Sequence, residues 1–203
     1  AERLNESLIA AVEAGNEGGV GQALRNGSSP NAKRKDRTAL WIAASKGYAA
    51  MVKLLAERGA NVNTPNNNGC TPVFIAAQKG HAEVLRLLAE LGANVNAPMN
   101  DGATPAFVAA QNGNVEVLRL LAELGANVET PNNNGAMPVL IAAQEGHAEV
   151  VRTLAELGAN VETPKNGGFT PVYIAAQEGH AEAVRLLAEL GAKVGTPAYG
   201  GVA

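Results

Sequence analysis

The sequence has 203 residues, a formal net charge of −3 and a pI near 5.7, so it offers no general electrostatic attraction for nucleic acid. A single cysteine excludes an internal disulfide, and no apolar run approaches the roughly 18 residues of a membrane-spanning helix. The first residues lack the basic start and apolar core of a signal peptide, and we therefore expect a cytoplasmic or nuclear protein in a reducing compartment.

The sequence of residues 1–32 indicates a degenerate first copy of the two-helix repeat that occupies the rest of the chain. Ile9 and Ala10 mimic the apolar face of one helix, and Val20 and Leu24 that of a second. Several polar residues among them suit the end of a stacked array, because a terminal unit must present a polar face to water.

The rest of the sequence repeats itself with a fixed period. One series of glycines, each 33 positions after the last, consists of Gly47, Gly80, Gly113, Gly146 and Gly179. Full copies of the repeat occupy residues 33–65, 66–98, 99–131, 132–164 and 165–197. A fixed period of this size is typical of stacked structural units rather than of one globular core, so we expect a single domain over 1–203.

Each unit is predicted to begin with a tight hairpin turn. In the copy at 66–98, Asn68-Gly69 is the dipeptide that a two-residue turn prefers, because both central residues need positive φ. Thr71 can then cap the free N–H groups of a helix, and Pro72 suits the first helical position.

Two helices should follow the turn. The first is predicted over about 72–79 and ends at Gly80, which is placed to adopt the left-handed conformation. The second is predicted over about 82–91, where apolar residues recur at i, i+3, i+4 and i+7, and it ends at Gly92.

This succession of turn, helix, helix and extended return, with the letters TPxx, AAxxGH and LLxxxGAxVN, resembles the ankyrin repeat. The resemblance covers 33–203 strongly and 1–32 loosely. It implies an all-α solenoid of stacked helix-turn-helix units with β-hairpin-like loops, a degenerate N-terminal capping repeat at 1–32 and a truncated tail at 198–203. We expect this chain to be a fragment of a longer array, the alternative being that the tail itself covers the end.

Several positions depart from the family's pattern. The histidine of the usual Thr-Pro-Leu-His is replaced by Trp41, Phe74, Phe107, Leu140 and Tyr173. Met137 replaces the capping threonine, which should destabilise its unit by about 1 kcal/mol, and Asp36 replaces the turn glycine of the first full unit.

No residues group into a catalytic, cofactor or metal site. His81, His147 and His180 share one register, but copies one repeat apart lie about 10 Å from each other, too far to share an ion whose ligands lie about 2 Å away. We expect them to bond loop backbone. Cys70 should lie on a hairpin tip without a histidine beside it, so we expect no enzyme and no cofactor.

The resemblance implies that a partner binds across the hairpin tips and the exposed side of the first helix. The corresponding polar and charged residues are Arg34, Lys35, Arg37, Lys46, Gln78, Gln111, Gln144 and Gln177. The aromatic residues Trp41, Phe74, Phe107 and Tyr173 lie beside them, either as binding hot spots or packed between repeats. Phe169 and Trp41 are expected to be exposed anchors.

The basic stretch at 32–37, AKRKDR, is open to three interpretations: a solvated turn, a localisation signal or an anion-binding patch. The glutamines of the first helices are identical, whereas the charge beside them changes from basic near Arg34 to acidic near Glu178. A partner of opposite polarity would complement that gradient.

We expect a non-catalytic protein–protein interaction scaffold with a protein partner and without nucleic acid or membrane. The alternatives are a structural spacer in a larger protein and an engineered repeat scaffold, neither with a ligand of its own. The last unit continues the internal pattern, so we expect a monomer able to associate end to end.

Overall fold

The computed structural model describes residues 2–194, and the predicted tail at 198–203 lies outside them. The described residues form twelve helices in six consecutive pairs, and one short hairpin of two strands. The helices in the first half of the chain are α1 (Glu2–Glu13), α2 (Glu17–Arg25), α3 (Ala39–Ser45), α4 (Ala49–Glu57), α5 (Pro72–Lys79) and α6 (Ala82–Glu90). Those in the second half are α7 (Pro105–Gln111), α8 (Val115–Glu123), α9 (Pro138–Gln144), α10 (Ala148–Glu156), α11 (Pro171–Gln177) and α12 (Ala181–Glu189).

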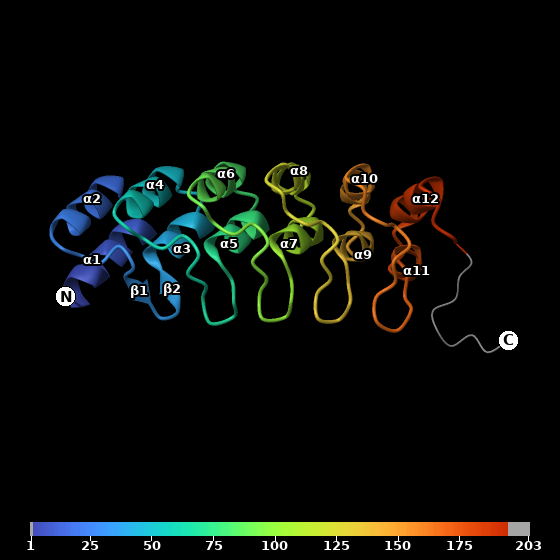
Figure 1. Ribbon diagram of the computed structural model, residues 1–203, viewed down its shortest axis with the longest axis horizontal. Coiled ribbons are helices and arrows are strands. Elements are labelled where there is room, and N and C mark those ends of the chain that lie inside the picture. Colours follow the sequence, from blue (N-terminus) through green and yellow to red (C-terminus); the bar gives the residue numbers. More distant parts are fainter. Residues whose placement is uncertain (1, 195–203) are drawn as a thin grey trace. The chain divides into compact units, whose positions relative to one another are not determined.

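The chain divides into two compact units, the first ending at Asn100 and the second beginning at Asp101. In the first unit, α1, α3 and α5 pack side by side in one layer, and α2, α4 and α6 in another. In the second unit, α7, α9 and α11 form one layer and α8, α10 and α12 the other (Figure 1). The predicted all-α architecture of stacked helix-turn-helix units is thus confirmed within each unit.

Small residues on the first helices let neighbouring helices approach closely. Ala43 and Ala44 of α3 and Ala76 and Ala77 of α5 are completely buried. A helix whose contact face is alanine can approach its neighbour near the short end of the usual 8–10 Å spacing. The larger apolar side chains fill the space between the layers, and Leu85 of α6 is completely buried there.

The helix boundaries follow the predicted signals closely. Helix α5 spans the predicted residues, and Gly80 ends it in the left-handed conformation with φ 75°. Helix α6 ends at Glu90, one residue before the predicted end, and Gly92 follows with φ 83°.

The hairpin turns differ from the predicted two-residue type. The Asn66 N–H donates to the Cys70 carbonyl, and the Gly69 N–H donates to the Asn66 carbonyl. Gly69 has φ 82°, whereas Asn68 is not among the residues with positive φ. The loop therefore holds three residues, a right-handed turn closed by a left-handed glycine, because the extra residue removes the need for positive φ at Asn68. The Asn66 side chain supports the loop by accepting from the N–H groups of Asn68 and Cys70.

The hairpin of the first full repeat is built differently. Strand β1 (Lys33–Arg34) pairs with strand β2 (Arg37–Thr38) in antiparallel fashion, with Arg34 opposite Arg37. Two residues, Lys35 and Asp36, connect the strands. Lys35 has φ 56° and is the single non-glycine residue with positive φ in the described part of the chain. Asp36 stands where other repeats have their turn glycine, and here the positive φ falls one residue earlier.

Candidate binding surface

In four of the described full repeats, a threonine caps the first helix by binding the backbone N–H of an aromatic residue. Each threonine hydroxyl accepts a hydrogen bond from the backbone N–H three residues later. The pairs are Thr38 with Trp41 at 3.0 Å, Thr71 with Phe74 at 3.2 Å, Thr104 with Phe107 at 3.2 Å and Thr170 with Tyr173 at 3.4 Å. Helix α9 has Met137 instead at the N-cap position, just before Pro138, and its side chain makes no capping bond.

Most of the predicted aromatic line is buried. Trp41, Phe74 and Phe107 are 7%, 3% and 5% exposed, whereas Tyr173 is 39% exposed. The prediction that Trp41 is an exposed anchor is therefore wrong. Its indole packs under the next hairpin, where Nε1 donates to the Cys70 carbonyl at 3.0 Å.

Phe169 is half-buried rather than fully exposed. Its ring lies beside that of Tyr173, with centroids 5.4 Å apart, and the Lys165 ammonium lies 5.5 Å from its centroid. These two rings are the accessible aromatic pair on the last full repeat.

The predicted glutamines lie at or next to the last residues of the first helices. Gln111 and Gln177 are exposed, and Gln78 and Gln144 are half-buried. One side chain of the same type is thus offered by each of four repeats.

The histidines bond backbone, as predicted, but their acceptors lie on helices rather than loops. His81 Nε2 is 3.2 Å from the Ser45 carbonyl oxygen, at the last residue of α3. His147 and His180 lie 3.1 and 2.9 Å from the carbonyl oxygens at the ends of α7 and α9. Each of these histidines therefore satisfies a free carbonyl at the end of the preceding first helix.

The hairpin tips are tied to one another by main-chain hydrogen bonds. In the first unit, the Asn100 N–H donates to the Asn68 carbonyl at 3.0 Å. In the second unit, the Asn133 N–H donates to the Asp101 carbonyl at 2.9 Å, and a further bond of 3.3 Å joins Asn166 to Asn134. In the second unit the tips are therefore connected to one another, and in the first unit the hairpin at 66–70 is tied to Asn100.

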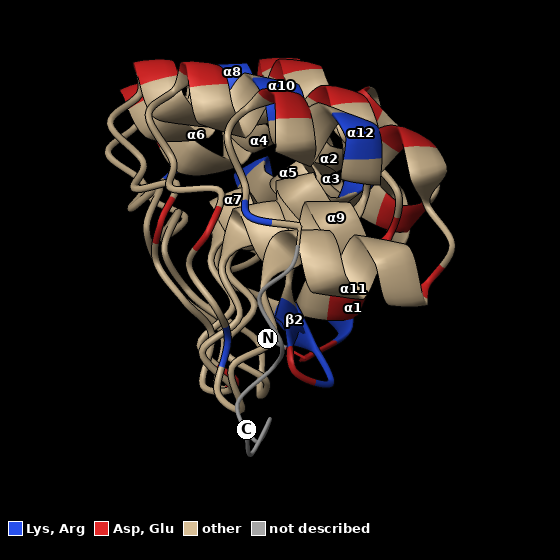
Figure 2. Ribbon diagram, turned by 90° about the vertical axis from the view of Figure 1, so that its right-hand side faces the viewer, with Lys and Arg blue, Asp and Glu red and all other residues tan. Residues whose placement is uncertain are grey.

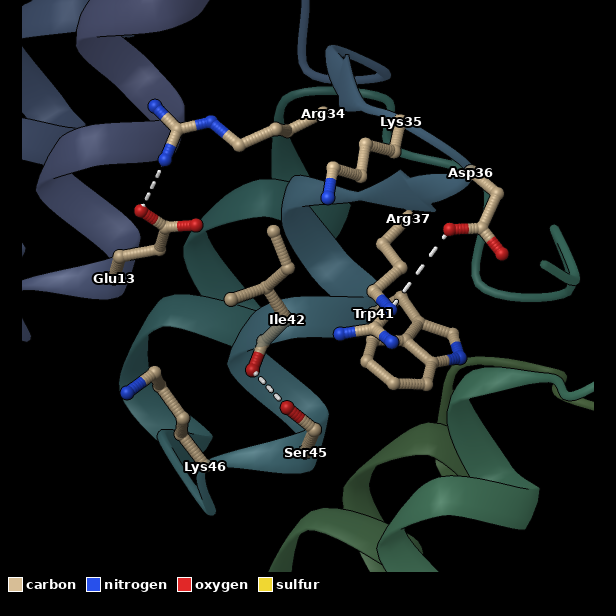
Figure 3. Close-up of a pocket in the computed structure, with 9 residues that line it drawn as sticks. All are labelled: Glu13, Arg34, Lys35, Asp36, Arg37, Trp41, Ile42, Ser45 and Lys46. Atoms are coloured by element: carbon tan, nitrogen blue, oxygen red, sulfur yellow. Dashed lines mark hydrogen bonds and ion pairs between the residues drawn. The ribbon is translucent and has the colours of Figure 1, made fainter.

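A groove of about 430 Å³ lies between the β1–β2 hairpin and α3. Its lining residues, all drawn in Figure 3, are Glu13, Arg34, Lys35, Asp36, Arg37, Trp41, Ile42, Ser45 and Lys46. The structure thus brings together five of the predicted binding residues, the four cations and Trp41. We name this cavity the basic groove.

The charges in the basic groove are only partly neutralised. Arg34 forms an ion pair with Glu13 of α1, and Arg37 Nε lies 3.9 Å from an Asp36 carboxylate oxygen. The Arg37 guanidinium stacks over the Trp41 ring, 4.9 Å from its centroid. Figure 3 shows Arg34 reaching toward Glu13, whereas Arg37 lies over Trp41 and Lys35 lies beside Arg37.

The place of Glu13 in the groove, beside Arg34, was not predicted from the sequence. It comes from the degenerate first repeat at 1–32 and lies 21 positions before its partner Arg34. A contact between two repeats with different sequence patterns does not recur along the sequence, so only the folded structure shows it.

A second groove of about 400 Å³ adjoins the basic groove, sharing Arg37, Trp41 and Ser45 with it. It extends along α5 to Gln78 and Lys79. We name it the adjoining groove.

Cys70 lines the adjoining groove but is buried, contrary to its expected place on an exposed tip. Burial raises the pKa of the Cys70 thiol above its ordinary value, and a hydrogen bond with Trp41 and the charge of Arg37 offset this only in part. The protonated thiol is a poor nucleophile at neutral pH.

Two kinds of feature are absent from the described residues. No group of His, Cys, Asp and Glu side chains within residues 2–194 could hold a metal ion. Among the helices of that same range, none is both long enough and apolar enough to cross a membrane.

Comparison with known families gives one result. A family model described as ankyrin repeats, in three copies, matches residues 8–99, 65–132 and 107–198. No curated protein matches the chain.

Proposed function

The chain belongs to the ankyrin-repeat family, whose members generally mediate protein binding, and from this we propose that it is a non-catalytic scaffold. Its partner is a protein, held across the hairpin tips and the exposed side of the first helices. No enzymatic activity is part of the proposal. The buried, protonated Cys70 thiol supports that view.

The main-chain bonds between hairpin tips are the observation that carries this proposal. In the second unit, the bonds from Asn133 to Asp101 and from Asn166 to Asn134 fix adjacent tips before any partner arrives. A preorganised surface binds more tightly than a mobile one, because little conformational entropy remains to be lost on association.

The distribution of charge in the second unit also supports this choice of surface. The first helices α7, α9 and α11 contain no charged residue, whereas the second helices α8, α10 and α12 each begin with a glutamate in their first turn. Figure 2 shows this contrast between α9 and α11 and the more highly charged α10 and α12. Charged residues are depleted at the centres of protein interfaces, so the uncharged layer is the better candidate.

The test compares two variants of the second unit that change the net charge equally. One replaces Gln111, Gln144 and Gln177 by arginine on the first helices. The control replaces Glu116, Glu182 and Glu189 by glutamine on the second helices. Each immobilised variant and the unaltered chain are incubated with a lysate of the source cells, and bound proteins are quantified by mass spectrometry.

We expect proteins that are captured by the unaltered chain and by the control to be lost from the arginine variant. Loss from the control alone would place the partner on the second helices and contradict the proposal. Capture of nothing by any of the three chains would favour a structural spacer, a role that the identical glutamines in successive repeats also suit.

A further inference from the structure

The basic groove combines positive charge, a stacked arginine and a cavity on one side of the first unit. Resting on the scaffold function proposed above, we infer that this groove binds an acidic peptide segment of the partner, with glutamate or aspartate side chains entering it. The adjoining groove holds the continuation of the same peptide.

The balance of charge in the groove favours an anionic ligand. Four cationic side chains, those of Arg34, Lys35, Arg37 and Lys46, line it against two carboxylates. The whole chain carries a net charge of −3, whereas the charge lining this groove is positive. A concave surface lined mainly by one sign of charge concentrates its field and attracts the opposite charge.

Arg37 is held in a geometry suited to a carboxylate. Its guanidinium carbon lies 4.9 Å from the centroid of the Trp41 ring, and the side chain is 56% exposed, so its N–H groups are accessible to a ligand. A planar guanidinium offers paired N–H donors that match the two oxygens of a carboxylate. The existing contact with Asp36 is long, at 3.9 Å, and the Arg37 side chain is exposed to solvent, so the pair contributes little and an incoming carboxylate can replace it.

Lys35 adds a further cation to the groove. It lies at the tip of the β1–β2 hairpin, and no ion pair joins it to a residue in the described range. Its backbone is left-handed, with φ 56°, and its side chain lines the groove. A ligand carboxylate there would meet an ammonium group that gives up no internal partner.

The groove is poorly suited to a nucleic acid. Single strands bind where bases can stack on exposed aromatic faces, but Trp41 is only 7% exposed and Arg37 covers its ring. Phe74 in the adjoining groove is 3% exposed. The carboxylates of Glu13 and Asp36 would also repel a continuous row of phosphates.

The adjoining groove provides a path for the rest of the peptide. It shares Arg37 and Trp41 with the basic groove and ends beside Gln78 and Lys79. Its lining mixes polar residues such as Asn68 with apolar residues such as Ile75 and Met99, which suits the backbone and uncharged side chains that follow an acidic anchor. The two grooves together run across the side of α3 and α5 that the scaffold proposal assigns to the partner.

Hexaglutamate, blocked at both ends, is the probe for this proposal, and blocked hexaglutamine is its uncharged comparison. Trp41 is the only tryptophan in the sequence and lies in the groove, so its fluorescence reports occupancy directly. We expect saturable binding of hexaglutamate that weakens with added salt, and at least tenfold weaker binding of hexaglutamine.

Two double variants distinguish binding in the groove from a general electrostatic attraction to the protein surface. Lys35→Gln with Arg37→Gln removes two cations from the groove, and Lys53→Gln with Arg58→Gln removes two exposed cations in and after α4. Calorimetric titration should show at least tenfold weaker hexaglutamate binding by the groove variant and less than a twofold change in the control. Thermal unfolding checks that both variants are folded.

Three results would overturn the inference: no hexaglutamate binding by the unaltered chain, equal losses in both variants, or tighter binding of a six-nucleotide oligothymidylate than of hexaglutamate. Each leaves the scaffold proposal standing, because that depends on proteins lost from the arginine variant of the second unit. Failure of the scaffold test, in turn, leaves the peptide titration interpretable by itself.

Discussion

At the scale of single residues, the start of α9 is the clearest weak point. Met137 occupies the N-cap position without a side-chain hydrogen bond, and the Leu140 N–H turns to the Met137 carbonyl at 3.0 Å. Met137→Thr should restore the missing acceptor and raise the free energy of unfolding by about 1 kcal/mol relative to Met137→Val. Valine matches threonine in shape without the hydroxyl, so urea denaturation of the two variants isolates the cap. Equal stability would mean that the hydroxyl does not reach the Leu140 N–H.

The residue scale also shows where the sequence misleads. The dipeptide Asn68-Gly69 predicted a two-residue turn, but Gly69 alone takes positive φ, because the loop is one residue longer than expected. Helix caps were predicted well, since Thr71 and Gly80 each act within their own helix. Local signals that involve one or two hydrogen bonds can be read from sequence, whereas loop length depends on which residues pair across the hairpin.

At the scale of structural elements, the glycine after each first helix has two roles. Gly146 and Gly179 have similar φ values, 75° and 79°, so a side chain strains the backbone at both. A Cβ at Gly146 would also lie 2.6 Å from the His180 ring of the next repeat, whereas at Gly179 no described atom lies within 4 Å. The glycine thus leaves room for the histidine that satisfies the end of α9.

These two glycines form a matched pair for mutation. Gly179→Ala should destabilise the protein by about 1 kcal/mol through backbone strain alone. Gly146→Ala should cost about 1–3 kcal/mol more, because the histidine must move. Chemical denaturation of the two variants measures the difference. Similar losses would show that the ring of His180 shifts without cost.

The pairing of elements was predictable because it follows from the period. The same helix–turn–helix pattern recurs every 33 residues, as from Gly47 to Gly80, so one repeat identifies the others. The burial of Trp41 was not predictable in this way. Its indole donates to the Cys70 carbonyl of the next repeat. A contact of this kind between two repeats cannot be recognised from the sequence of either repeat alone.

At the scale of the whole molecule, side chains in the return loops reach the backbone of the following repeat within each unit. The Asn63 oxygen accepts from the Asn94 N–H at 2.8 Å in the first unit. In the second, Glu129 accepts from the Asn160 N–H at 2.8 Å. Repeat proteins depend on contacts between neighbours for their stability, so these bonds couple the folding of adjacent repeats.

Removing one of these acceptors tests that coupling. Glu129→Ala should lower the free energy of unfolding by about 1 kcal/mol, since the Asn160 N–H loses its partner. Glu129→Gln keeps an acceptor oxygen and should be almost neutral, which distinguishes hydrogen bonding from charge. Urea denaturation followed by circular dichroism gives both values. An equal loss in the two variants would assign the effect to the carboxylate charge.

The bonds between hairpin tips run through the main chain, as between the Asn68 carbonyl and the Asn100 N–H, or the Asn134 carbonyl and the Asn166 N–H. Replacing the side chain of Asn68 or Asn134 therefore leaves these main-chain hydrogen bonds in place. Mutations of these side chains can change which ligand the tips bind while the backbone arrangement of the hairpins is kept. New binding specificities can therefore evolve one substitution at a time.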